Sequence, residues 1–105
     1  MAAYKLSIVS PHGKAFDGDC ESLVTTGREG DFGVLAHHAP MIAMLKPGIT
    51  KITNAGQTNY FVTGEGVCEV AQDGVNLLVD TATKTAGHDE AKTELAKYLV
   101  TTGAK

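Results

Sequence analysis

The chain has few cysteines and no long apolar run, and these absences exclude several classes of protein. Its two cysteines, Cys20 and Cys68, stand far apart and form no CxxC pair, so neither a zinc knuckle nor a redox motif is expected. No apolar stretch is long enough to span a membrane, and no basic flank with an apolar stretch marks a secretory signal. We therefore expect a soluble cytosolic protein with two reduced, half-buried thiols.

Positive charge is also scarce. Nine Lys and Arg residues face twelve Asp and Glu residues, which gives a formal net charge of -3 and a pI near 5.7. A nucleic-acid partner is not expected, because phosphate-binding surfaces need clustered Lys and Arg. The 105 residues, 43% of them hydrophobic, are enough for one core without disulfide bonds.

Alternation of apolar and polar residues predicts a mainly β protein. The pattern begins at Tyr4, and the turn sequences at 54–57 and 73–74 are typical of hairpins. Strands that recur at this spacing indicate a sandwich or a barrel. The predicted strands are 4–9, 15–18, 20–26, 50–53, 58–63, 67–71 and 75–80.

The end of the sequence has a different character. Residues 89–100 are rich in Ala, Glu, Lys and Leu with apolar residues at helical spacing, which predicts one short amphipathic helix. Asp89 and Glu90 favour its start, and Gly103 can end it. Such a short helix must lie on another surface to be stable. We expect a β-domain over 1–86 and a helical tail over 87–105.

Candidates for chemistry are weak. His37 and His38 are neighbours whose side chains point apart on an extended chain, so we expect a solvated His37 and a packing or partner contact for His38. No GxSxG elbow is present, and a hydrolase has no support. The acidic residues at 17, 19 and 21 indicate a solvated strand edge, and the glycines at 27, 30, 64 and 66 indicate turns.

One stretch, TGREGDFGVLAHHAPMIAMLKPG from Thr26 onward, carries several ordered motifs. It resembles the epsilon subunit of the bacterial and chloroplast F-type ATP synthase, whose pattern is TG-x-EG-(D/E)-(F/L)-G followed by HAP and KPG. The segments YKLSIVSPHGKAFDGDCESLVTTG and GEGVCEVAQDGVNLLVDTA resemble the first strands and the last hairpin of that family. The resemblance covers roughly residues 4 to 92.

This resemblance implies a flattened two-sheet β-sandwich with a short C-terminal helix. The function implied is that of a non-catalytic central-stalk subunit that couples gamma rotation to the c-ring during ion-driven ATP synthesis. The partners would be the gamma subunit, the c-ring and the catalytic head. The subunit would sit peripherally on the cytoplasmic face of the inner membrane or on its organelle equivalent, with no membrane span, cofactor, metal or catalytic residue of its own.

The resemblance also implies individual contacts. A loop at Glu29, Gly30 and Asp31 would face the c-ring. The positions implied to lie near the gamma subunit are Ser10, His38, Met41, Ile42, Ala43 and Glu65.

The tail departs from the family, which normally has two inhibitory helices. The segment from His88 offers room for one helix, so we expect a weak or absent inhibitory arm. Only Asp89 matches the motif by which some members bind ATP, and nucleotide binding is not predicted. The alternatives are a free-standing ligand-binding β-module and a small metal-dependent enzyme.

Overall fold

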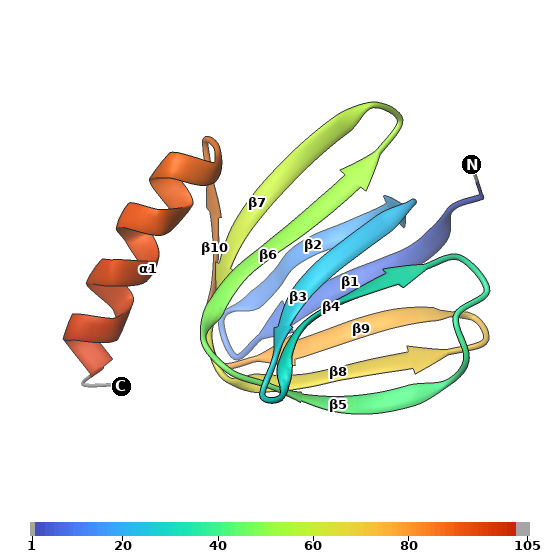
Figure 1. The fold of residues 1–105 in the computed structure, drawn as a ribbon, viewed down its shortest axis with the longest axis horizontal. Helices are drawn as coiled ribbons and strands as arrows, with labels where there is room; N and C mark the ends of the chain where they lie inside the picture. The colour runs from blue at the N-terminus through green and yellow to red at the C-terminus, as the bar shows by residue number, and fades with distance from the viewer. Residues whose placement is uncertain (1, 103–105) are drawn as a thin grey trace.

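The computed structural model describes residues 2–102, which form ten strands followed by one helix (Figure 1). The elements in chain order are β1 (Tyr4–Ser10), β2 (Gly13–Cys20), β3 (Ser22–Gly27), β4 (Gly30–Leu35), β5 (Met41–Leu45), β6 (Gly48–Asn54), β7 (Gln57–Thr63), β8 (Gly66–Ala71), β9 (Gly74–Val79), β10 (Ala82–Thr85) and α1 (His88–Thr102).

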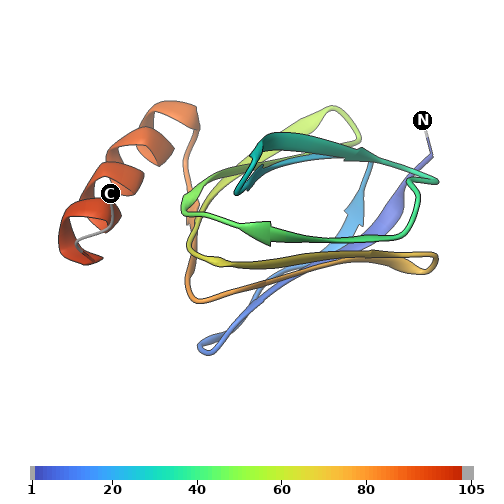
Figure 2. The same cartoon turned by 60° about the horizontal axis from the view of Figure 1, so that its bottom comes forward.

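The strands form two facing layers of one continuous ladder (Figure 2). One layer holds β4, β3, β6, β7 and β10, and the other holds β5, β8, β9, β1 and β2. The layers join where Gly27 of β3 pairs with Leu45 of β5. The predicted β-sandwich with a short C-terminal helix is therefore confirmed. The strands β4, β5 and β10 were not predicted from the sequence.

Hairpin turns lie where the sequence places them. Ala55 and Gly56 have positive φ angles of 51° and 79° between β6 and β7, and Gly74, which begins β9 directly after the β8–β9 turn, has φ 153°. Glycine tolerates this conformation because it has no Cβ. The expected turns at 54–57 and 73–74 are confirmed.

The core lies between the two layers. Buried side chains alternate along β1, β6 and β9, as the period of two requires. The expectation of half-buried thiols is wrong, because Cys20 and Cys68 both lie in the core with 0% exposure. The fully buried large side chains of the core include Leu6, Ile8, Leu23, Leu45, Ile52, Phe61 and Leu77.

A chain of three buried hydroxyl groups interrupts the apolar core. The Oγ1 atom of Thr50 lies 2.8 Å from the Oγ1 of Thr25 and 2.8 Å from the Oγ1 of Thr63. All three residues have 0% exposure. The chain links β3, β6 and β7, and each member keeps its neighbours hydrogen-bonded where water cannot reach.

Helix α1 packs outside the sandwich against β6, β7 and β10. Ala91 is fully buried there, and the hydroxyl of Tyr98 donates to the Oδ2 of Asp80 at 3.2 Å. The Glu90 carboxylate accepts a hydrogen bond from the backbone N–H of Ala86, as suits an acidic residue in the first turn.

The predicted end of the helix at Gly103 lies outside the described residues. Within 2–102, no helix is long and apolar enough to cross a membrane.

Replacing Thr50 by Val tests the hydroxyl chain. Thr50→Val should lower the free energy of unfolding by about 1 to 3 kcal/mol, because it leaves two buried hydroxyl groups without their partner. The triple change of Thr25, Thr50 and Thr63 to Val should cost less than the single change, since it leaves no hydroxyl of this chain without a partner. Urea unfolding of both variants measures this. A triple variant less stable than the single one would contradict it.

Candidate protein-docking site

The outer face of the β5–β8–β9–β1 layer carries a continuous line of apolar side chains. Met44 is opposite Val67, Val67 is opposite Leu78, and Leu78 lies beside Val9 on the parallel neighbour β1. Residues paired across a ladder point to the same face. Met44 and Leu78 are 53% and 51% exposed, and both valines are half-buried. We call Val9, Leu78, Val67 and Met44 the apolar row.

A mostly polar row borders the apolar row on the same face. Ile42 is opposite Glu69, Glu69 is opposite Asn76, and Asn76 lies beside Ser7. The Ser7 hydroxyl donates to the Oδ1 of Asn76, and the Nδ2 of Asn76 lies 3.5 Å from the Oε1 of Glu69. An apolar centre beside polar groups is typical of a surface that binds another protein.

The structure separates the three apolar residues predicted near gamma. Ile42 points outward and is 72% exposed. Met41 and Ala43 point inward and pack against the core. Of this segment, only Ile42 therefore offers its whole side chain to a partner.

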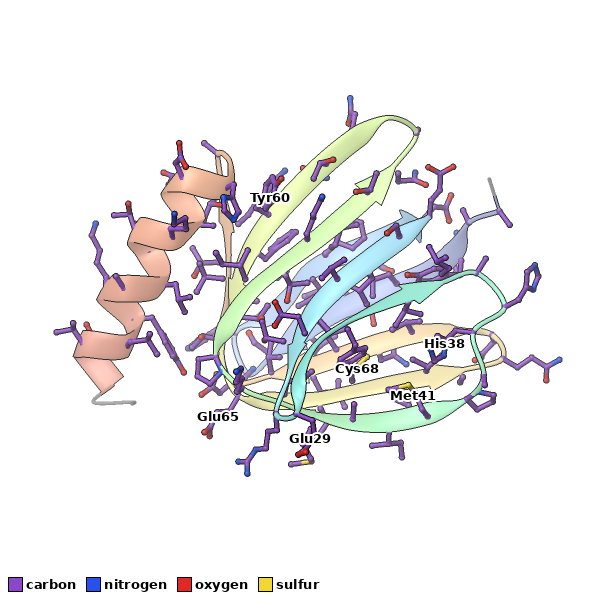
Figure 3. The ribbon with its side chains drawn as sticks, in the orientation of Figure 1. Glu29, His38, Met41, Tyr60, Glu65 and Cys68 are labelled. Atoms are coloured by element: carbon purple, nitrogen blue, oxygen red, sulfur yellow. The ribbon has the colours of Figure 1, made fainter. Side chains whose placement is uncertain are left out.

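The remaining residues predicted near gamma lie at different places. Ser10 ends β1 in the turn towards β2, where its hydroxyl accepts the N–H of His12 and donates to the carbonyl of Gly13. Glu65 is exposed just before β8, whereas His38 is exposed in the β4–β5 loop at the opposite end of the sandwich (Figure 3). The expected gamma residues therefore form no single compact patch.

His37 and His38 do not converge on one site. Both are exposed, and His37 has a positive φ of 67°. The Nδ1 of His38 lies 2.7 Å from the carbonyl oxygen of Ala39. An open groove of about 700 Å³ lies beside them, between the start of β1, the β4–β5 loop and the β8–β9 turn. Among residues 2–102, no group of three His, Cys, Asp or Glu side chains stands ready for a metal ion.

Glu29, Gly30 and Asp31 lie together at the exposed turn between β3 and β4, which we call the hairpin tip. Gly30 has φ 133°, a conformation that favours glycine. The N–H of Arg28 donates to the carbonyl of Met44 at 2.9 Å, which fastens the tip to β5. Glu29 and Glu65 lie at the same end of the sandwich, away from His38 (Figure 3).

Both thiols are poor nucleophiles. Burial raises the pKa of Cys68 from its ordinary 9.0 to about 11. Burial also raises the pKa of Cys20, whose Sγ lies 3.5 Å from the Tyr4 hydroxyl. The Tyr4 hydroxyl itself donates to the Val34 carbonyl at 2.7 Å and ties β1 to β4 across the core. These groups hold the sandwich together and present no reactive atom.

Sequence reasoning did not find the apolar row. Val9, Val67 and Leu78 lie in predicted strands and Met44 in a segment that was not predicted as one, and the row exists only once four strands are in register. One of these pairings, β1 with β9, joins segments far apart in the chain. No pattern within a single segment of the sequence indicates this pairing.

Comparison with known proteins gives a consistent family. The family model for "ATP synthase, Delta/Epsilon chain, beta-sandwich domain" matches residues 3–85. The chain is 43% identical over 89 residues to the ATP synthase epsilon chain of Rhodopseudomonas palustris strain HaA2, covering 85% of this chain and 66% of the relative. It is 42% identical over 91 residues to the epsilon chain of Afipia carboxidovorans, covering 87% of this chain and 67% of the relative. The chain thus spans about two thirds of the length of these curated relatives.

Two solved structures share the fold. A chain of the Euglena gracilis mitochondrial ATP synthase, a structure of OSCP, F1 and c-ring, matches with a TM-score of 0.78 and 24% identity, covering 100% of this chain and 66% of that one. A chain of the Tetrahymena thermophila mitochondrial ATP synthase central stalk and c-ring matches with a TM-score of 0.65 and 15% identity, covering 97% and 96%. At these identities the likeness concerns the fold alone.

The raised pKa of Cys68 predicts a loss of stability at high pH. In the unfolded chain the thiol ionises near pH 9.0, but in the folded chain it stays protonated until about pH 11. The unfolded state therefore binds fewer protons in this window, and the free energy of unfolding falls as pH rises through it. Urea unfolding at about pH 8, below this window, and at about pH 10.5, within it, measures the fall. A Cys68→Val control should show a smaller fall, and an equal fall would contradict the assignment.

Proposed function

The chain belongs to the family of ATP synthase epsilon chains, and we propose that it works as a non-catalytic central-stalk subunit that couples gamma rotation to the c-ring. The partners in this proposal are the gamma subunit, the c-ring and, through gamma, the catalytic head. The subunit would then lie peripherally at the cytoplasmic face of the inner membrane or its organelle equivalent. No cofactor is assigned to it.

The apolar row is the observation that carries this proposal. Met44 and Leu78 are each more than half exposed on the same sheet face, and Ile42 lies beside them. Water-exposed apolar side chains gathered in one line favour burial against another protein. We assign this face, with the half-buried Ser10 and the exposed Glu65 near one end, to the gamma subunit.

A mechanical role suits the way the sheet is connected. The strands β5, β8, β9, β1 and β2 pair in an unbroken ladder, so a force applied to one strand passes to the next through backbone hydrogen bonds. Arg28 ties the hairpin tip directly to β5. A load applied at the tip would therefore reach Met44 of the apolar row through this hydrogen bond.

The hairpin tip supports a contact with the c-ring. Glu29 and Asp31 are exposed and carry no ion pair in the part of the chain that the structure describes. Acidic side chains on a projecting turn favour basic residues on the facing surface. Because the tip lies at one end of the sandwich, it can meet the ring while the sheet face meets gamma.

The groove beside His38 favours one alternative, a free-standing module that binds a small molecule. Its volume of about 700 Å³ is sufficient, and it is lined by apolar and polar groups together. Purification distinguishes the two functions. A bound small molecule recovered with the isolated chain, without any affinity for gamma, would favour the module.

Two leucines allow a matched test of the gamma face. Leu78 in the apolar row and Leu35 on β4 in the other layer are 51% and 54% exposed. Leu78→Glu should weaken binding to the gamma subunit by about 2 kcal/mol or more, because it buries a carboxylate in an apolar contact. Leu35→Glu should leave the affinity unchanged. Titration calorimetry with purified gamma measures both, and equal effects of the two changes would contradict the assignment of this face.

Removing the charges of the hairpin tip tests the c-ring contact. The double variant Glu29→Gln, Asp31→Asn should weaken binding of the gamma complex to isolated c-rings by roughly 0.5 to 1 kcal/mol at low ionic strength, with less effect at high ionic strength. Asp73→Asn with Asp89→Asn removes the same charge elsewhere and serves as the control. An effect shared by both double variants would mean that net charge alone is responsible.

A further inference from the structure

The four strands that border the two layers are β2, β4, β5 and β10, and they differ in how their edges are protected. Charged residues commonly guard exposed edges against unwanted pairing. β2 carries Lys14, Asp17 and Asp19, and β4 carries Asp31. β10 has only four residues and lies beside the helix. β5 reads Met-Ile-Ala-Met-Leu, with no charge, proline or glycine. It is the one unguarded edge among the described strands.

The backbone groups of Ile42 face out of this edge. In an antiparallel ladder, alternate residues direct their N–H and C=O groups to the paired strand, and the residues between them direct theirs away. The carbonyl of Met44 faces away from β8, because it accepts the N–H of Arg28 from the other side. Ile42, two residues earlier, therefore also faces away. On this outer side, opposite β8, no described strand pairs with β5 at Ile42.

The free edge of β5 is short, because the contact between Arg28 and Met44 ends it on one side. Arg28 occupies the position beside Met44, so an added strand can run only beside residues 40–43. Pro40 has no N–H to donate. The edge therefore offers one donor, the N–H of Ile42, and two acceptors, the carbonyls of Ile42 and Pro40. Such a pattern fits a short extended segment of another chain.

A second copy of this chain is the rival occupant of the same edge. Pairing of two copies about Ile42 would set Pro40 of the copy beside Met44, where Arg28 already lies. Pairing about Met41 would avoid Arg28 and let the N–H of Ile42 donate to the carbonyl of Pro40 in both directions. We favour the gamma subunit, because the edge continues into the apolar row that the proposed function assigns to gamma. Protection of the Ile42 amide in the free chain that grows with protein concentration would identify a second copy and overturn the inference.

We propose that a short extended segment of the gamma subunit adds to the edge of β5 and hydrogen-bonds with the backbone of Ile42. This inference rests on the proposed function, and it adds main-chain pairing to the side-chain contact of the apolar row. The two surfaces are continuous, since the side chains of Ile42 and Met44 lie on the same outer face. Main-chain pairing sets the register of the partner, and the row contributes apolar burial.

Amide hydrogen exchange tests the pairing directly. In the free chain the Ile42 amide should exchange quickly, whereas the Ala43 amide, which faces Cys68 on β8, should exchange slowly. Adding gamma should slow exchange at Ile42 by about ten-fold or more and leave Ala43 unchanged. Slow exchange at Ile42 in the free chain, or no slowing on binding, would overturn the inference.

Two variants at one position distinguish main chain from side chain. Ile42→Pro removes the outward N–H but no hydrogen bond to β8, so the fold should be retained. Ile42→Ala removes most of the side chain and keeps the N–H. Ile42→Pro should weaken gamma binding about ten-fold more than Ile42→Ala, and equal weakening would overturn the inference. Circular dichroism and the urea midpoint check that each variant is folded.

The two levels of the proposal fail in different ways. If gamma binds with the expected dependence on Leu78 but Ile42 shows no protection, the edge pairing is wrong and the proposed function stands. If gamma does not bind the unmodified chain at all, both are wrong.

Discussion

The register of four strands, β5, β8, β9 and β1, is the constraint on which the rest of the structure depends. It places Ala43, Cys68, Leu77 and Ile8 on the inner face and the apolar row on the outer face. Because side chains alternate with a period of two, a slip by one residue would exchange the faces. The core would then receive Glu69 and Asn76, and burying those groups without partners costs more than the fold can tolerate. The need for a closed core thus also determines where the exposed row lies.

The corner between the layers limits what this surface can bind. Gly27 pairs with Leu45, and a Cβ on Gly27 would lie 2.8 Å from the carbonyl oxygen of Gly30. A larger residue there would force the hairpin apart, so glycine permits the tight tip. The same corner brings Arg28 to Met44 and ends the free edge of β5. One close backbone approach therefore positions the acidic tip, joins the two layers of the sandwich and sets the length of the open edge.

Much of the fold could be predicted from local patterns, and the failures have physical causes. The strands β6 to β9 were all predicted, and glycine with positive φ stands at the β6–β7 turn and at the start of β9, after the β8–β9 turn. β5 was missed because Ile42 and Met44 are apolar and outward, so MIAML shows no alternation. β4 was missed because Gly30 and Gly33 interrupt its pattern. The burial of Cys20 and Cys68 depends on strand pairing, which composition does not report. For the site, the resemblance led to Ile42 and to the acidic tip, but Met41 and Ala43 point into the core.

The central claim is that the exposed face of the sandwich exists to bind the gamma subunit. Isothermal titration of the unmodified chain with gamma at several temperatures tests it most directly. We expect a dissociation constant of about 1 µM or tighter and a negative heat-capacity change, because the apolar row leaves water on binding. An absence of binding, or binding with a heat-capacity change near zero, would contradict the account.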